Sequence, residues 1–239
     1  MRLEECEANA PAKPKRDEDN QPDGYEDSLF DRCSWFYALC REYLFRDHTR
    51  EINQTLWPPA GPQPSSHILE LGCGPGFYSC TLAEQHPQIQ MTGLDLSETL
   101  LRRARHRAHT RRLRNCRFLQ GNALDLTRTI DPVDAVIVSR LFLIVSDRRE
   151  AMQQIFRVLR PGGRCFIAEP TNGFRTRIPL SCMWLLARLS TRPLTNYREP
   201  RQAEVLNRKE FRSLIASQPW EQVRYWHDGW YQYAVCERT

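Results

Sequence analysis

The chain has 239 residues and a formal net charge of +5, and this length allows one large domain with a sizeable core. Its nine cysteines form no CxxC pair and no Cys/His cluster at zinc-ligand spacing, which argues against a metal site and suits free thiols in a reducing cytoplasm. No run reaches the roughly 18 apolar residues of a membrane span, and the first residues lack the apolar core of a signal peptide, so we expect a cytoplasmic protein.

Residues 1–24 are rich in Pro, Asp, Glu and Lys and have almost nothing to bury, which predicts a disordered leader. Apolar and aromatic residues recur at helical spacing over 25–57 and predict a helical cover of one or two amphipathic helices. The stretch "WPPAGPQPSS" ends this segment, because four prolines within seven residues cannot continue a helix. A single domain is therefore expected over 25–239.

Short apolar runs alternate with helical patterns between residues 67 and 170. The runs "HILELG", "QMTGLDL", "CRFLQGNA", "DAVIVS" and "RCFIAEP" predict strands, and 77–86, 97–112 and 147–160 predict helices. Strands that alternate with helices of this length indicate a parallel sheet covered on both faces. Gly162 and Gly163 are expected to end the last of these helices and turn the chain into the strand at 164–169.

The last third of the chain has a different pattern. An apolar helix is expected over 177–190, within a segment inserted at 174–206 that we interpret as a lid on the acceptor side. Asn207 and Glu210 have the spacing of a helix capping box, and the aromatic-rich end alternates around Asp228-Gly229, a hairpin signal. The sheet is therefore predicted to end in an antiparallel strand pair.

The turn "GCGPG" joins the first predicted strand to the first predicted helix, and such a glycine-rich turn exposes backbone N–H groups to a ligand. Glu70 precedes the turn, and its carboxylate would repel a pyrophosphate but attract an ammonium group. Asp95 ends the next strand, where a carboxylate can accept both hydroxyls of a ribose. Asn122 in "QGNA" could bond to an adenine edge, so the ligand carries an ammonium, a ribose and a base.

These groups describe S-adenosylmethionine (SAM), and the sequence resembles the class I SAM-dependent methyltransferase family from roughly Tyr25 to the C-terminus. The resemblance is carried by "ILELGCGPGFYSCTLAE", "GLDLS", "QGNA" and "FRVLRPGGRCFIAEP". Within that superfamily, "VSRLFLIVSDRREAMQQIFRVLRPGGRCFIAEP" and "NYRE" are similar to the C-methyltransferases of ubiquinone and menaquinone biosynthesis. The resemblance implies a Rossmann-like α/β fold: a seven-stranded, mostly parallel sheet that ends in an antiparallel hairpin, with helices on both faces.

The resemblance also implies a set of cofactor contacts in SAM binding. The residues are Glu70, Gly72, Gly74, Gly76, Asp95, Leu96, Asn122, Ala123, Ser139 and Arg140. The glycines would border methionine and ribose, Glu70 would hold the amino end, and Asp95 would take the ribose. Leu96 would pack on adenine, and Asn122 with Ala123 would meet the edge of the base. Ser139 and Arg140, at the end of the fourth strand, would lie beside the sulfonium. Asn122 departs from the family, in which an acidic residue is more usual.

The sulfonium is an activated methyl donor, so the protein must mainly position the acceptor in line, exclude water and, where needed, remove a proton. No metal is required for this chemistry. Glu169, Tyr197 and His227 are candidate bases. A carboxylate that caps a loop explains Glu169 at least as well, and His227 beside a hairpin turn is more simply an exposed strand residue. The apolar stretch 178–189 and the aromatic hairpin lie where the superfamily builds its acceptor pocket. A small, partly apolar acceptor, methylated at carbon, oxygen or nitrogen, is therefore expected.

Eight arginines and two histidines between positions 102 and 117 leave an alternative open. A basic helix can bind nucleic acid or anionic lipid headgroups, although a solvated outer face explains it more simply. Methyltransferases that modify bases commonly carry an (N/D)PP(Y/F) motif after the fourth strand, where this chain reads "SRLF", so nucleic acid is not the expected partner. The remaining alternatives are a methyltransferase acting on RNA or protein and a SAM-binding protein without catalysis.

Overall fold

The computed structural model describes residues 39–40, 45–171 and 205–239. The predicted disordered leader at 1–24, most of the helical cover and all but the last two residues of the predicted lid lie outside the described residues. The six cysteines within them, at positions 40, 73, 80, 116, 165 and 236, are all free. None of the described helices has the length and apolar character needed to span a bilayer.

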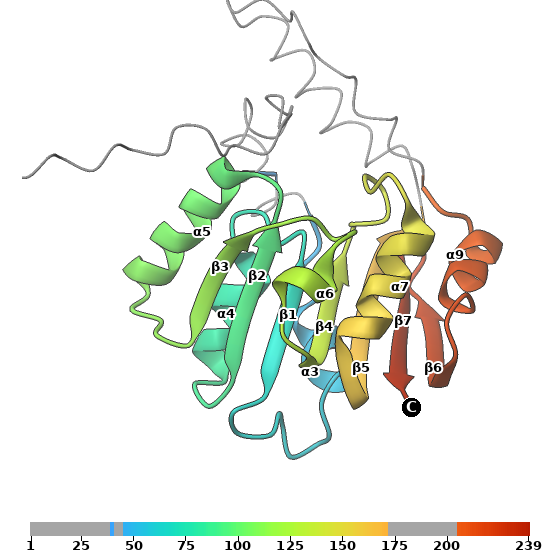
Figure 1. Ribbon diagram of the computed structural model, residues 1–239, viewed down its shortest axis with the longest axis horizontal. Coiled ribbons are helices and arrows are strands. Elements are labelled where there is room, and N and C mark those ends of the chain that lie inside the picture. The colour runs from blue at the N-terminus through green and yellow to red at the C-terminus, as the bar shows by residue number, and fades with distance from the viewer. Residues whose placement is uncertain (1–38, 41–44, 172–204) are drawn as a thin grey trace, which may run out of the picture.

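A seven-stranded sheet forms the centre of the molecule (Figure 1), with the strand order β3-β2-β1-β4-β5-β7-β6. The strands are β1 (His67–Leu71), β2 (Gln90–Asp95), β3 (Cys116–Gln120), β4 (Val133–Ser139), β5 (Leu159–Pro170), β6 (Trp220–His227) and β7 (Tyr231–Arg238). Neighbouring strands are parallel except for β7, which is antiparallel to both β5 and β6. The predicted mostly parallel sheet with a terminal antiparallel hairpin is confirmed.

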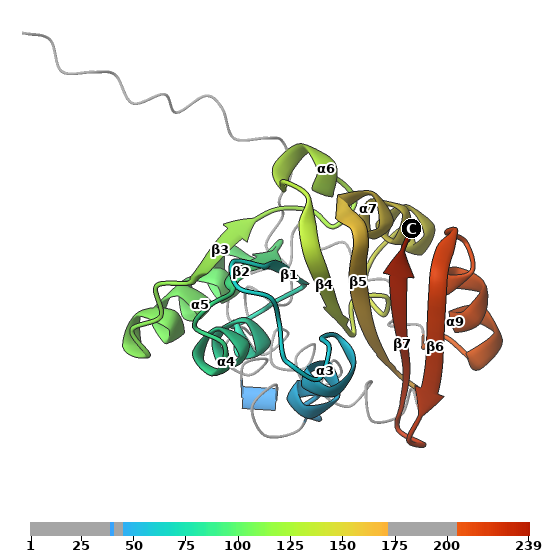
Figure 2. The same ribbon diagram turned by 90° about the horizontal axis from the view of Figure 1, so that it is seen from below.

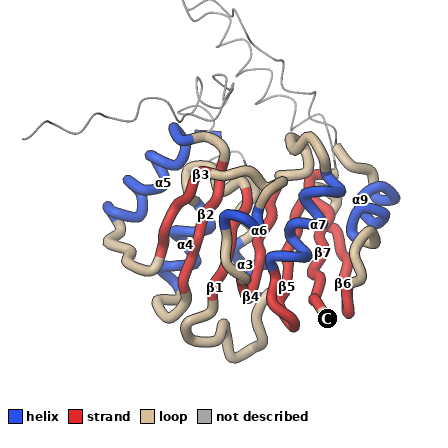
Figure 3. Tube along the Cα trace, in the orientation of Figure 1, coloured by secondary structure: helices blue, strands red, loops and turns tan. Residues whose placement is uncertain are grey.

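Helices cover both faces of the sheet, as the end-on view in Figure 2 and the colouring in Figure 3 show. The described helices are α3 (Thr49–Thr55), α4 (Phe77–Gln85), α5 (Glu98–Thr110), α6 (Leu126–Thr129), α7 (Arg148–Val158) and α9 (Arg208–Ile215). The helices α3, α4 and α5 lie on one face, and α6, α7 and α9 lie on the other. The parallel strands therefore have a buried core on each side, which explains their nearly continuous apolar sequences.

Side-chain caps start three of these helices. Ser97 accepts a hydrogen bond from the backbone N–H of Leu100 at the start of α5, and Asp147 caps α7 in the same way. At α9 the predicted capping box is present in full, because Asn207 bonds to the N–H of Glu210 while the Glu210 carboxylate accepts the N–H of Asn207. These caps fix the helix starts beside the strand ends.

The strand β5 begins earlier than the sequence indicates. It starts at Leu159 rather than at 164, and α7 ends at Val158, so Gly162 and Gly163 lie inside the strand and do not end the helix. Leu159 pairs with Val133 of β4, and an ion pair of 2.8 Å joins the neighbouring Arg160 and Asp134 side chains. Pairing with β4 thus holds the residues from Leu159 onward in a strand, although the local sequence favours a longer helix.

The parallel strands β1, β2, β4 and β5 all end at one edge of the sheet, which we call the carboxyl edge. Because β7 runs in the opposite direction, it begins there, with Tyr231 opposite Pro170, the last residue of β5. Ligands of open parallel sheets bind at such an edge, where the strand order reverses, and here the reversal lies between β1 and β4. The carboxyl edge is therefore the place to look for the site.

Candidate active site

The glycine turn that follows β1 has a backbone conformation that residues other than glycine rarely adopt. The φ angles of Gly72, Gly74 and Gly76 are +65°, +51° and +73°. A Cβ atom at Gly76 would lie 2.8 Å from the Cβ of Ala104 and 2.9 Å from the ring of Phe118. Gly76 is thus required by the turn and by the close packing of α5 and β3 against it, a reason that the sequence pattern alone does not reveal.

Asp95 joins the glycine turn to the start of α5. Its Oδ2 accepts the backbone N–H of Gly74 at 2.8 Å, and its Oδ1 accepts the N–H of Ser97 at 2.9 Å. The carboxylate is held beside the turn by these two bonds, and a carboxylate can accept about four hydrogen bonds in all. It can therefore take ribose hydroxyls while it stays anchored. Its role as ribose ligand stays a prediction, now with a fixed position at the carboxyl edge.

Glu70 lies behind the turn and is buried. Its Oε2 accepts the backbone N–H of Ser79 at 2.7 Å and also the hydroxyl of the same residue. The N-cap of α4 is Gly76, which has no side chain, so Glu70 supplies the missing acceptor and places a negative charge at the helix N-terminus. The predicted contact with the amino end of the cofactor is not tested by this arrangement.

The residues predicted to contact adenine surround the ends of β2 and β3. Leu96 is a large apolar residue that is 48% exposed, and its contact with adenine stays a prediction. The Oδ1 of Asn122 accepts the N–H of Leu124 at 2.9 Å in a local turn, and Ala123 is buried. Because its carbonyl oxygen already bonds within the turn, the Asn122 amide N–H group is the part that can reach a base edge.

The end of β4 contains an unusual backbone residue. Arg140 has a φ of +60°, which is uncommon for a residue other than glycine and is found mainly in turns and functional sites. Its N–H donates to the carbonyl of Ala168 at 2.9 Å, and its guanidinium lies 3.7 Å from the ring centroid of Phe45. The preceding Ser139 has a buried hydroxyl with no hydrogen-bond partner within the described part of the chain.

The candidate bases lie in different places. Glu169 is buried at the end of β5, where its Oε1 accepts the N–H of Phe142 at 3.0 Å, and burial raises the pKa of its carboxyl group to about 8. His227 is exposed on the outermost strand β6, 3.3 Å from the Arg208 guanidinium. Tyr197 lies outside the described residues. Glu169 thus anchors the loop after β4, and His227 is two strands beyond β5 at the edge of the sheet.

The sequence analysis did not single out His48, a fully buried histidine just before α3. Three tyrosines surround its ring, Tyr78 from α4 and Tyr231 and Tyr233 from β7. A lone histidine between two helical patterns carries no local signal of function. Only the fold brings it to the strand ends.

The described residues fit SAM. Asp95 could offer its carboxylate to the ribose, Leu96 an exposed apolar side chain to the adenine face, and Ser139 a buried hydroxyl that has no hydrogen-bond partner among the described residues. All three lie at the carboxyl edge, on or directly after β2 and β4. Bound there, SAM would supply an electrophilic methyl group. Within the described residues there is no cluster of three or more His, Cys, Asp or Glu side chains that could hold a metal ion.

Comparison with known proteins agrees with this geometry. The family profile described as "Methyltransferase domain" matches residues 62–216, which include the glycine turn, Asp95 and the ends of β4 and β5. The chain belongs to this family. The family supports the cofactor inferred from the sequence, SAM, and the structural neighbours below confirm the predicted class of fold.

Among relatives of this methyltransferase domain, a trans-aconitate 2-methyltransferase of Acidovorax sp. (strain JS42) is 33% identical over 138 residues, 58% of this chain and 50% of the relative. A demethylmenaquinone methyltransferase of Lactococcus lactis subsp. lactis is 35% identical over 106 residues, 44% of this chain and 42% of the relative. The chain thus spans about half the length of the curated relatives that it matches.

Solved structures share the fold at lower identity. A SAM-dependent methyltransferase from Aquifex aeolicus has a TM-score of 0.62 at 16% identity and covers 86% of this chain and 98% of its own. An O-methyltransferase family protein from Burkholderia thailandensis has a TM-score of 0.62 at 18% identity and covers 87% of this chain and 60% of its own. At this identity the likeness concerns the fold.

Proposed function

We propose that this methyltransferase transfers the methyl group of SAM to a small, partly apolar organic molecule at carbon, oxygen or nitrogen. The observation that carries the proposal is the anchored carboxylate of Asp95, which two backbone N–H groups hold beside the glycine turn at the carboxyl edge. The relatives act, by their names, on trans-aconitate and demethylmenaquinone, both small molecules. Their names support a small acceptor for this chain.

Cofactor binding tests the first half of the proposal. Calorimetry should detect SAM and S-adenosylhomocysteine at micromolar concentration, and Asp95→Asn should weaken both by about 10- to 100-fold, since hydrogen bonds to a charged group contribute about 1.5–3 kcal/mol. The matched control is Asp134→Asn, because Asp134 bonds to the N–H of His67 at the opposite end of β1. A wild-type protein that binds neither ligand would refute the proposal.

Transfer of a labelled methyl group tests the second half. Incubation with labelled SAM and a metabolite extract should transfer label to a small molecule in the wild type and much less in Asp95→Asn. A protein that binds SAM but labels no small molecule would instead be a binding protein or a methyltransferase for macromolecules. Protein-bound or RNA-bound label in the same extract would separate these two outcomes.

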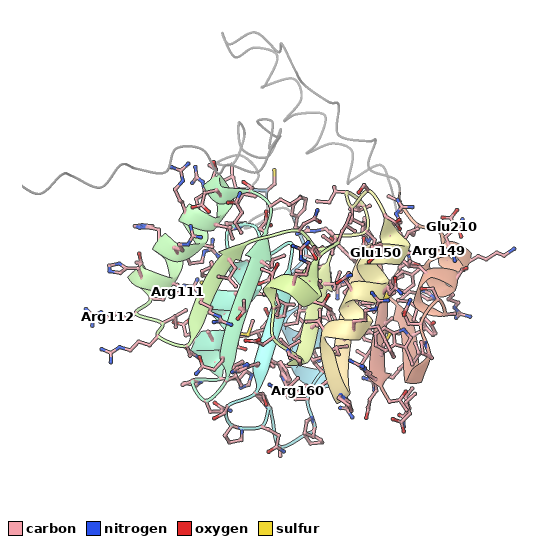
Figure 4. All side chains as sticks on the ribbon, viewed as in Figure 1. Arg111, Arg112, Arg149, Glu150, Arg160 and Glu210 are labelled. Atoms are coloured by element: carbon pink, nitrogen blue, oxygen red, sulfur yellow. The ribbon has the colours of Figure 1, made fainter. Side chains whose placement is uncertain are left out.

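The Arg-rich segment gives little support to an RNA substrate. Its buried face is apolar, with Leu100, Leu101, Ala104 and Ala108, so the arginines occupy the outer face of α5. Arg105 pairs with Glu98 at 2.6 Å and Arg111 with Glu84 at 3.2 Å, which reduces the positive charge of that face. In Figure 4, Arg111 and Arg112 lie at the far end of α5 and project away from the sheet.

A further inference from the structure

A pocket of about 520 Å³ lies between the glycine turn and the first half of α5. The described residues that line it are Pro75 of the turn and, from α5, Thr99, Arg102, Arg103, His106 and Arg107. Among these residues there are three guanidinium groups and no carboxylate. We call this site the arginine pocket. It gathers positive charge beside the proposed cofactor site, where α5 begins (Figure 1).

The helical period explains why these side chains share one face of α5. Residues three and four apart in a helix are neighbours on its surface, so Arg102, Arg103 and His106 follow Thr99 along one stripe. The apolar residues of α5 form another stripe, which is buried against the sheet. The side chains of Arg102, Arg103 and His106 are exposed. The basic stripe is therefore open to a ligand from solution.

The ion pairs of the Arg-rich helix involve other arginines. Glu98 pairs with Arg105 at 2.6 Å, on an exposed face that lies beside the basic stripe. Glu84 of α4 pairs with Arg111 at 3.2 Å, beyond the last turn of α5. These pairs reduce the charge of the helix as a whole, but they leave the arginine pocket without an acidic partner among the described residues.

Arg102 and Arg103 keep most of their hydrogen-bond donors available. Within the described part of the chain neither forms an ion pair, and Arg102 donates to the Thr99 hydroxyl at 3.3 Å. A guanidinium has five N–H donors, so this one bond leaves the others for a ligand. The Asp95 carboxylate, at the same end of α5, is held by two backbone N–H groups and is not part of the pocket lining.

Arg107 completes the pocket on the side of α4. Its guanidinium lies 5.8 Å from the ring centroid of Phe77, the first residue of α4 after the glycine turn. A cation over an aromatic ring is attracted to the negative face of the ring. This contact therefore holds a third positive charge beside the turn and next to the basic stripe.

We propose that the arginine pocket binds a phosphate group, with Arg102 and Arg103 as its main contacts and His106 as a further donor. Guanidinium groups stay charged in proteins, and their planar fork pairs with two phosphate oxygens at once. A phosphate ester carries a charge of about −1.5 to −2 at pH 7 and has three acceptor oxygens. A carboxylate has one charge and two oxygens, so it would use fewer of the donors.

This binding site goes beyond methyl transfer and does not depend on it. Two sources share the proposed chemistry, a soluble phosphate ester and the headgroup of an anionic lipid. Either would place its phosphate against the outer side of the glycine turn, next to the cofactor. The experiments below therefore test the phosphate site first and then separate the two sources.

Calorimetry with inorganic phosphate, glycerol 3-phosphate and acetate, at constant pH and ionic strength, tests the ligand class. The wild type should bind both phosphates, and acetate at least about 10-fold more weakly. The double variant Arg102→Gln/Arg103→Gln should lose about 10-fold or more in phosphate affinity, because it removes two charged donors. Acetate binding as tight as phosphate binding, or a wild type that binds neither phosphate, would overturn the proposal.

The matched control is Arg105→Gln/Arg111→Gln, which removes the same charge from arginines outside the pocket. In Figure 4, Arg111 lies at the far end of α5 from the pocket. This variant should keep phosphate affinity within twofold of the wild type, and thermal melts check that both variants are folded. Equal losses in the two double variants would indicate a diffuse effect of net charge and would overturn the pocket.

NMR locates the bound phosphate without any change to the arginines. In protein labelled with ¹⁵N-histidine, added inorganic phosphate should shift the imidazole signals of His106, which are assigned by their loss in His106→Gln. His67 starts β1 at the opposite edge of the sheet, and its signals should stay in place. Phosphate binding that leaves the His106 signals unchanged would place the anion elsewhere and would overturn the inference.

Vesicle flotation separates the two sources of phosphate. Phosphatidylcholine vesicles with and without phosphatidic acid are mixed with the wild type and the two double variants. Binding that needs phosphatidic acid and is lost only in Arg102→Gln/Arg103→Gln would support the pocket and identify a lipid headgroup. Calorimetric binding of glycerol 3-phosphate without binding to vesicles would support the pocket and identify a soluble ester. Vesicle binding that is unchanged in Arg102→Gln/Arg103→Gln would overturn a lipid role for the pocket.

Discussion

Replacing Glu169 by glutamine should stabilise the protein at alkaline pH. Glu169 is 1% exposed at the end of β5, and burial raises the pKa of its carboxyl group to about 8 from an ordinary value of 4.5. Gln232 stands opposite it on β7, and its Oε1 is buried without a hydrogen-bond partner within the described residues. A protonated Glu169 can donate to that oxygen, as can the amide of a glutamine, and either keeps an acceptor for the N–H of Phe142.

The size of the effect follows from proton linkage. A carboxyl whose pKa is raised on folding stabilises the protein fully at low pH, and this contribution is lost as pH rises from about 4.5 through about 8. The difference between the two pKa values corresponds to about 5 kcal/mol as an upper value, at 1.36 kcal/mol for each pH unit. Glutamine does not titrate, so its variant escapes this loss.

Urea unfolding at pH 5, 7 and 9 measures the difference directly. We expect wild type and Glu169→Gln to have similar free energies of unfolding at pH 5, and the variant to be more stable by several kcal/mol at pH 9. Glu84→Gln is the control, because the Glu84 side chain is 57% exposed on the surface and should show no such trend. A wild-type-to-variant difference that stays constant from pH 5 to pH 9 would refute the reasoning.

Three further predictions concern the turn, the cap and the hairpin. In thermal melts, Gly76→Ala should lower the free energy of unfolding by about 2 kcal/mol or more, because the residue has a φ of +73° and an added Cβ would be crowded. Gly229→Ala, where a Cβ would have open space, should lower it by only about 1 kcal/mol. Equal losses for the two variants would contradict the packing argument. Asn207→Ala should cost about 1 kcal/mol through loss of the capping box, and restoration by Ser but not by Val would identify the cap as the cause. Tyr233→Phe should lower the free energy of unfolding by about 1.5 kcal/mol or more, because the Tyr233 hydroxyl donates to Oδ2 of Asp228 at 2.8 Å and a hydrogen bond to a charged group is lost; a thermal melt that matches the wild type would contradict this role.

The sequence allowed the fold to be predicted where local and tertiary preferences agree. The run at 67–71 is apolar, is followed by glycines and precedes a helical period, and it forms β1 as expected. The capping box at Asn207 marks a helix start in the sequence as in the structure. The predicted start of β5 was wrong, because the pairing of Leu159 with Val133 is a contact between residues far apart in the chain, which the local sequence does not reveal.

In the candidate site, too, some residues could be predicted from the local sequence and others could not. The position of Asp95 at the carboxyl edge was predictable because the last residue of a parallel strand directly follows a short apolar run. His48 was not, because its partners Tyr78, Tyr231 and Tyr233 come from two other elements and from residues up to 185 positions away. A histidine whose contacts come from so far along the chain leaves no pattern in its own neighbourhood.

The reversed direction of β7 has a practical consequence. Because β7 starts at the carboxyl edge, it ends at the other edge of the sheet, and Figure 1 places the C-terminus there. Anything that follows Thr239, such as an affinity tag, a fluorescent fusion or a surface tether, would leave the molecule at the edge opposite the glycine turn. Immobilisation through this end should therefore leave the carboxyl edge, with the proposed cofactor site, facing the solution.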